Sequence, residues 1–116
     1  MKRALPGPYT FILNGNHNLT KIYGYNKKTV GIRVPDHAIA RSIVDALGAP
    51  ILSASIKNED TVLEYITDPN DIYEAYQSLV DIVIDGGPGG NIPSTIIDCT
   101  GPEPVLVREG AGVFVV

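Results

Sequence analysis

The sequence predicts an α/β fold in which a mixed, twisted sheet has two helices packed on it. Strand-like and helix-like patterns alternate in the first half of the chain, whereas strand-like patterns follow one another near its end. The chain has 116 residues and is 44% hydrophobic, which is enough for one globular domain with a core.

Two strands are expected in the first third of the chain. Residues Tyr9–Leu13 are aromatic and β-branched and follow a proline-rich turn, which is typical of a strand. A second strand is expected over Thr29–Val34, where apolar residues alternate with other types. The face opposite the apolar one then consists of Thr29, Gly31 and Arg33. An arginine is therefore expected near the end of this strand.

The first helix is predicted after this second strand. Ile39, Ile43 and Leu47 recur at the spacing of one helix face, and Gly48 ends the pattern. Asp36 is the expected N-cap, because a short acidic side chain accepts hydrogen bonds from the free N–H groups of a first helical turn.

A second helix is predicted to begin at Asp68 and Pro69. Aspartate is a favourable N-cap, and proline suits the first helical position because its missing N–H would have no partner there. Ile72, Tyr76 and Leu79 then lie on one face of this helix.

The remaining apolar runs are expected to be strands. Each is short, contains isoleucine or valine, and is bounded by glycine, proline or polar residues. The expected segments are Ile51–Ser55, Asp81–Asp85, Ser94–Asp98, Pro104–Arg108 and Val113–Val116. The glycine-rich segment 86–91 is expected to be a turn, because it lacks the lysine and hydroxyl residue that end a P-loop.

Composition excludes several classes of protein. A single cysteine forms neither an internal disulfide nor a zinc site with several thiolates. No apolar run approaches the ~18–20 residues of a membrane span, and the N-terminus lacks the apolar segment of a signal peptide. The histidines have no partners at metal-ligand spacing, so no metal site is expected. A cytoplasmic location fits these features best.

Charge is unevenly distributed along the chain. The net charge is −4, yet six of the nine basic residues precede Pro35, where no acidic residue occurs. One interpretation is a basic surface that attracts phosphate groups. The other is that these residues decorate loops around an early hairpin, which is favoured where nucleic acid is concerned because nucleic-acid binders are usually basic overall.

Two arginines and three serines are the candidate ligand-binding groups. Arg33 and Arg108 each lie near the end of an expected strand, where a guanidinium suits bidentate binding of a carboxylate or phosphate. Hydroxyls near strand ends come from Ser53, Ser55 and Ser94. The alternative for each arginine is an exposed side chain that pairs with a nearby Asp or Glu. Residue spacing alone leaves both interpretations open.

Six segments of the chain resemble the YrdC/YciO family and occur in the family's order. They are Pro6–Leu13, Thr29–His37, Pro50–Ser55, Gly86-Gly87, Pro93–Asp98 and Val107–Gly112. Together they span nearly the whole chain, and the resemblance is closer to the YciO-like branch than to the best-known synthases. It implies that residues 1–116 form a single partial YrdC-like domain, similar to the C-terminal part of the family's fold and without its N-terminal portion.

The resemblance implies a function and a set of ligand contacts. The family is known for threonylcarbamoyl-AMP synthases, which join L-threonine, bicarbonate and ATP, release pyrophosphate, and supply threonylcarbamoyladenosine formation in tRNA. By motif, the ATP-binding positions are Thr29, Ser55 and Arg108, and the threonine-binding positions are Arg33, Ser53 and Ser94. ATP is expected with a divalent metal, Mg²⁺, as a substrate. No catalytic residue is assigned.

Two departures from the family pattern qualify these expectations. Lys57 stands where the synthases carry an asparagine after Ser55, and the absent N-terminal portion of the family carries further substrate contacts. The chain is therefore expected to be incomplete as an enzyme alone. The alternative is an RNA-binding or non-catalytic remnant module with tRNA or double-stranded RNA as partner. An exposed sheet edge also predicts a homo-oligomer.

Overall fold

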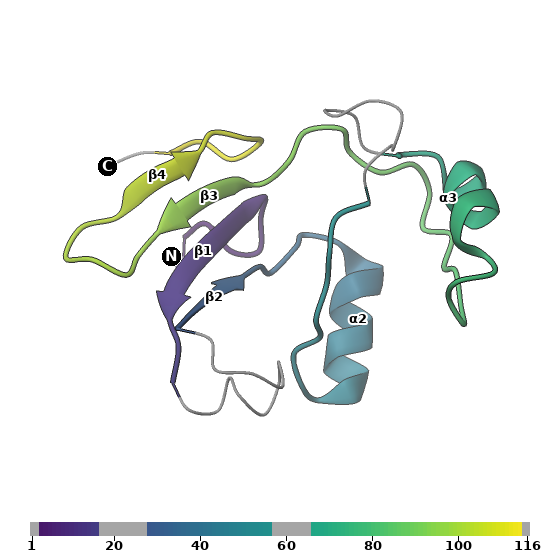
Figure 1. Ribbon diagram of the computed structural model, residues 1–116, viewed down its shortest axis with the longest axis horizontal. Helices are drawn as coiled ribbons and strands as arrows, with labels where there is room; N and C mark the ends of the chain where they lie inside the picture. The colour runs from purple at the N-terminus through teal and green to yellow at the C-terminus, as the bar shows by residue number, and fades with distance from the viewer. Residues whose placement is uncertain (1–2, 17–27, 57–65, 115–116) are drawn as a thin grey trace. The chain divides into compact units, whose positions relative to one another are not determined.

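The computed structural model describes residues 3–16, 28–56 and 66–114, and within them it contains one sheet and two helices (Figure 1). In chain order the elements are β1 (Tyr9–Asn14), β2 (Thr29–Ile32), α2 (Ala38–Leu47), α3 (Pro69–Tyr76), β3 (Thr95–Asp98) and β4 (Val105–Arg108). Lys57 and residues 115–116 lie outside the described residues.

The sheet is mixed, as the sequence predicts. Its strand order is β2-β1-β3-β4 (Figure 1). β1 is antiparallel to β2 and parallel to β3, while β3 and β4 are antiparallel with a register shift between Ile96 and Ile97. The two central strands come from opposite ends of the sequence, so the sheet forms only when distant segments of the chain meet.

One face of the sheet carries the small apolar core. Phe11 in β1 lies beside its β3 partner Ile97, and the two side chains are only 3% and 6% exposed. Tyr9, on the same strand, stacks against Phe11 with ring centroids 6.1 Å apart. Because strand side chains alternate, the neighbours of Phe11 along β1 belong to the opposite face of the sheet.

Both predicted helices are present, and one boundary of each is corrected. α2 ends before Gly48, whose positive φ of 74° is a conformation that glycine adopts readily. Its first helical hydrogen bond runs from the Arg41 N–H to the His37 carbonyl. His37 therefore occupies the cap position, and the expected N-cap Asp36 lies one residue too early.

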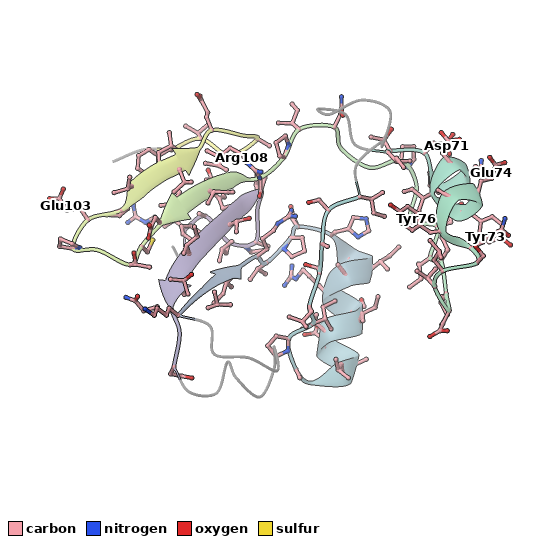
Figure 2. All side chains as sticks on the ribbon, viewed as in Figure 1. Asp71, Tyr73, Glu74, Tyr76, Glu103 and Arg108 are labelled. Carbon is pink, nitrogen blue, oxygen red and sulfur yellow. The ribbon has the colours of Figure 1, made fainter. Side chains whose placement is uncertain are left out.

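α3 begins as the sequence predicts. The carboxylate of Asp68 accepts a hydrogen bond from the Asn70 N–H at 2.9 Å, and proline occupies the first turn. The helix ends at Tyr76, so Leu79 lies beyond it rather than on its apolar face. Side chains of α3 are labelled in Figure 2.

The chain divides into two units. The first consists of residues 1–42 and 93–116 and contains the whole sheet, while the second consists of residues 43–92. Among the described residues of the second unit, no side chain is buried, and Leu52 and Ile82 are 61% and 76% exposed.

Three of the expected strands are not formed in the described residues. The segments 51–55 and 81–85 and residues 113–114 have no strand pairing. Their isoleucine and valine content is typical of strands, but a strand also needs a partner for its N–H and C=O groups. The expected strands at Ser94–Asp98 and Pro104–Arg108 are confirmed, each beginning one residue later. No helix in the described part is long and apolar enough to cross a membrane.

Candidate functional site

The sheet face opposite the core gathers several polar candidate residues. In the antiparallel pair, Thr29 lies opposite Asn14, and Gly31 lies opposite Ile12. Thr10 shares this face because it is two residues from Ile12 along β1. The bare Gly31 is also close to Thr10, since a Cβ added at Gly31 would lie 3.4 Å from the Thr10 Cγ2. Backbone pairing therefore brings Thr29 and Thr10 to one surface.

The same face continues across β3 and β4. Ile96 is the partner of Thr10 in the parallel pair and of Arg108 in the antiparallel pair. Ser94, two residues before Ile96, lies just ahead of β3 and is 9% exposed. Residues 10, 94 and 108 are thus brought together although they are distant in sequence.

Ser94 is the centre of a hydrogen-bonded cluster, which we call the Ser94 cluster and which consists of Thr10, Ser94 and Arg108. The Thr10 and Ser94 hydroxyl oxygens are 2.7 Å apart, and either one can be the donor. The Arg108 Nε and Nη2 both donate to the Ser94 carbonyl oxygen, at 3.0 and 2.7 Å. Nη2 also donates to the Ser94 Oγ at 3.2 Å. The serine is thus held at its backbone and at its side chain.

The guanidinium of Arg108 has donors to spare for a ligand. Nε and Nη2 are occupied by Ser94, whereas the two N–H groups of Nη1 form no hydrogen bond within the described part of the chain. Arg108 is half-buried at the end of β4, beside β3 (Figure 2). Its free edge suits a carboxylate or phosphate oxygen.

A second hydroxyl holds the loop that follows β4. Thr95 is fully buried, donates from Oγ1 to the Gly112 carbonyl at 2.5 Å, and accepts from the Gly110 N–H at 3.1 Å. The loop lies so close that a Cβ at Gly110 would collide with the Pro93 and Ser94 backbone. Thr95 and Gly110 therefore fix the backbone around Ser94, and the fully buried Thr95 side chain is not accessible to a ligand.

Thr29 and Arg33 are exposed near the other edge of the sheet. Thr29 begins β2, and Arg33 directly follows its last residue, Ile32, which pairs with Phe11. Within the described residues, Arg33 forms no hydrogen bond or ion pair. The sequence-based alternative of an arginine paired with a carboxylate is therefore not seen there, and no described residue occupies the donors of Arg33.

Ser53 and Ser55 lie in the second unit. Both side chains are exposed, and their segment has no regular secondary structure. The structure thus joins two of the six predicted site residues by direct contact, Ser94 and Arg108, and sets Thr29 on the same sheet face. Thr10 is the member of the cluster that sequence analysis missed. Alternation along Tyr9–Leu13 would have set Thr10 opposite the apolar face, but its contact with Ser94 depends on the parallel pairing of β1 with β3.

Asp98 is the last residue of β3, and its carboxylate stabilises the turn that follows this strand. Its Oδ1 accepts hydrogen bonds from the Thr100 hydroxyl at 2.6 Å and the Thr100 N–H at 2.9 Å. The Thr100 hydroxyl, followed by its backbone N–H, lowers the pKa of Asp98 below the usual 3.8, because both stabilise the carboxylate. Thr100 is tied in turn to β1, since its carbonyl accepts from the Asn14 amide at 3.2 Å.

The chemistry of the Ser94 cluster is that of binding and orientation. It offers a permanent cation and two hydroxyls, none of which is a general base near neutral pH. Among the described residues, no group of three or more His, Cys, Asp or Glu side chains could hold a metal ion. The arrangement suits an anionic ligand that is held in place while another group reacts with it.

The chain belongs to the Sua5/YciO/YrdC family. The sequence profile of this family, whose description is telomere recombination, matches residues 1–110. The chain is 41% identical to YciO of Escherichia coli K12 over 113 residues, which covers 97% of this chain and 54% of that protein. It is 31% identical to the threonylcarbamoyl-AMP synthase of Pyrococcus abyssi over 112 residues, or 94% of this chain and 32% of the synthase.

Solved structures give the same result. The crystal structure of E. coli YciO superimposes with a TM-score of 0.85 at 40% identity, covering 97% of this chain and 55% of that one. The structure of P. abyssi Sua5 complexed with L-threonine has a TM-score of 0.78 at 30% identity, covering 94% of this chain and 32% of that one. The predicted α/β fold class, with a mixed sheet and two helices, is confirmed. The chain spans about half the length of the YciO relatives that it matches.

Proposed function

We propose that this chain carries part of the substrate site of a threonylcarbamoyl-AMP synthase-like protein, which binds L-threonine and ATP. The observation that carries the proposal is the set of hydrogen bonds from Arg108 to Ser94, which places a guanidinium edge and a hydroxyl on one sheet face. Support comes from the relatives, because threonylcarbamoyl-AMP synthases match at about 30% identity and one related structure contains L-threonine.

Each predicted site residue that lies in the first unit has a role that its chemistry suits. Arg33, exposed and without a partner in the described part, binds the threonine carboxylate. Ser94 hydrogen-bonds the same amino acid, and Arg108 binds the ATP phosphates through its free Nη1 edge. Thr29 offers a hydroxyl to the nucleotide. The roles that the resemblance implies for Ser53 and Ser55 stay predictions.

In this proposal the residues orient reactants and screen charge. The neutral amine of threonine and bicarbonate combine to a carbamate and release water. A carbamate oxygen then bonds to the α-phosphorus of ATP as the bond between that phosphorus and pyrophosphate breaks. Charge develops on the phosphate oxygens, where a guanidinium stabilises it without any protein group gaining or losing a proton. Mg²⁺ enters with the nucleotide, bound by phosphate oxygens, which are ligands that this hard cation prefers.

Calorimetric titration with L-threonine and with ATP plus Mg²⁺ tests the proposal. We expect Arg33→Ala to raise the Kd for L-threonine by about tenfold or more, because a hydrogen bond to a charged group contributes about 1.5–3 kcal/mol. Arg41→Ala is the matched control, since Arg41 is also exposed and its side chain has no partner among the described residues. The absence of threonine binding by the wild-type chain, or equal Kd values for both variants, would contradict the proposal.

The outer sheet edge supports a second proposal, self-association through β4. This strand is last in the sheet order, so among the described residues no strand pairs with the backbone groups on its outer side. Val105 and Val107 are 59% and 55% exposed. We expect light scattering to give a mass above the 12.4 kDa of one chain, and Val107→Lys to reduce it. A monomer at high concentration would refute this.

Nothing in the described part favours RNA binding, and the net charge of −4 opposes it.

A further inference from the structure

Either hydroxyl can be the donor in the hydrogen bond between Thr10 and Ser94. The two oxygens are 2.7 Å apart, so one hydroxyl donates to the other. Ser94 Oγ has one proton and two lone pairs, and one lone pair already faces the Arg108 Nη2, which can only donate. The direction of the Thr10–Ser94 bond therefore decides whether Ser94 keeps a proton for a ligand.

The two directions have different consequences. If Ser94 donates to Thr10, Ser94 Oγ has no proton left and cannot donate to a ligand. If Thr10 donates to Ser94, both lone pairs of Ser94 Oγ are occupied and its own proton points elsewhere. An anionic ligand oxygen is a stronger acceptor than a hydroxyl, since charge-assisted hydrogen bonds are roughly twice as strong as neutral ones. A carboxylate beside Ser94 thus selects the second direction.

We propose that Thr10 is a positioning residue that orients the Ser94 hydroxyl as a hydrogen-bond donor to an anionic oxygen of L-threonine. The inference rests on the proposed function, since it assigns a donor direction to a serine of that site. The nearby positive charge of Arg108 strengthens Ser94 as a donor, and the three groups form one polarised chain. An ammonium group would not gain from this arrangement, because it is a cation and has no acceptor for the Ser94 proton.

The surroundings of Thr10 fit a ligand-facing role. Its partner strand carries the exposed Gly31, where even a single methyl group would reach van der Waals contact with the Thr10 Cγ2 at 3.4 Å. The missing side chain at Gly31 therefore leaves the surface beside Thr10 uncovered. Thr10 itself is half-buried, and its hydroxyl is held in place by the hydrogen bond to Ser94.

Substitutions at Thr10 that separate the effect of its hydroxyl from that of its side-chain shape test the inference. Thr10→Val keeps the β-branched shape and removes the hydroxyl, whereas Thr10→Ser keeps the hydroxyl. We expect Thr10→Val to raise the Kd for L-threonine about fivefold, the effect of one hydrogen bond, and to leave the Kd for ATP plus Mg²⁺ within about twofold. Thr10→Ser should restore threonine binding. Thr67→Val, whose hydroxyl has no partner in the described part, is the matched control.

Each outcome of this titration decides a different point. Unchanged threonine binding by Thr10→Val overturns the role of Thr10 and leaves the proposed function standing. An equal loss for L-threonine and ATP, or a loss that Thr10→Ser does not restore, assigns Thr10 to packing and also overturns the inference. No threonine binding by the wild-type chain overturns both proposals. Should Thr10→Val unfold, Thr10→Ala also lacks the hydroxyl and replaces it in the same comparison.

Discussion

Arg108 is the side chain whose removal the structure predicts to be most informative. Its Nε and Nη2 donate to the Ser94 carbonyl oxygen at 3.0 and 2.7 Å, so Arg108→Ala leaves a backbone acceptor of a 9% exposed residue without its partner. A hydrogen bond from a charged donor contributes about 1.5–3 kcal/mol. Because Arg108 is half-buried and water replaces part of this interaction, we expect the two bonds together to contribute about 2 kcal/mol to the free energy of unfolding.

This free energy converts to a measurable change in melting temperature. The entropy of unfolding is about 2.1 cal/mol/K per residue, so a loss of about 2 kcal/mol lowers the Tm of a chain of this length by about 8 °C. Arg108→Lys keeps the charge, but its single ammonium cannot reproduce the planar two-nitrogen contact. We therefore expect about half the loss for this variant.

Thermal unfolding followed by circular dichroism measures the series. Arg41→Ala again serves as the control, because its exposed side chain in α2 has no partner in the described part, and its Tm should stay within about 1 °C of the wild type. A Tm for Arg108→Ala equal to that of the control would show that the hydrogen bonds from Arg108 to Ser94 do not stabilise the fold. A Tm for Arg108→Lys equal to that of the wild type would show that the positive charge suffices and that the planar geometry is not what matters.

Three further predictions concern the loop, the sheet face and the end of β3. Gly110→Ala places a methyl group against the Pro93 and Ser94 backbone, so we expect it to lower the free energy of unfolding by about 1–3 kcal/mol in chemical denaturation. Gly31→Val, in contrast, adds a good strand former on an open surface and should keep or raise the Tm while weakening threonine binding in calorimetry. Asp98 has a lowered pKa, so its stabilising effect is present above the unfolded value of 3.8 and is lost as the pH falls through the lower folded value. The Tm difference between the wild type and Asp98→Asn should therefore be largest near neutral pH and shrink below pH 3.8.

These predictions have matched controls and clear contrary results. Gly101→Ala adds a methyl group where nothing lies within 4 Å, so an equal effect for Gly110→Ala would refute the close approach of that loop. Unaltered threonine binding by a folded Gly31→Val would mean that the ligand does not use the surface beside β2. A pH-independent Tm difference for Asp98→Asn would show that the carboxylate charge does not contribute to stability.

Local chemistry made several parts of the fold predictable. β1, β3 and β4 follow from short apolar segments bounded by turn residues, and α3 begins where Asp68 and Pro69 indicate. The segments 51–55 and 81–85 have the same composition and yet form no strand in the structure. Composition describes what a strand tolerates, whereas the partner that completes its hydrogen bonds comes from elsewhere in the chain.

The candidate site divides in the same way. The sequence alone determined which side chains are able to bind an anion, because a guanidinium at Arg33 or Arg108 has that chemistry wherever it lies. Only the tertiary structure decided that Arg108 holds Ser94 and that Thr10 joins them, since Thr10 and Ser94 are separated by 84 positions in the chain. Their contact exists because β1 pairs in parallel with β3, and such pairing depends on long-range packing rather than on the residues within either strand.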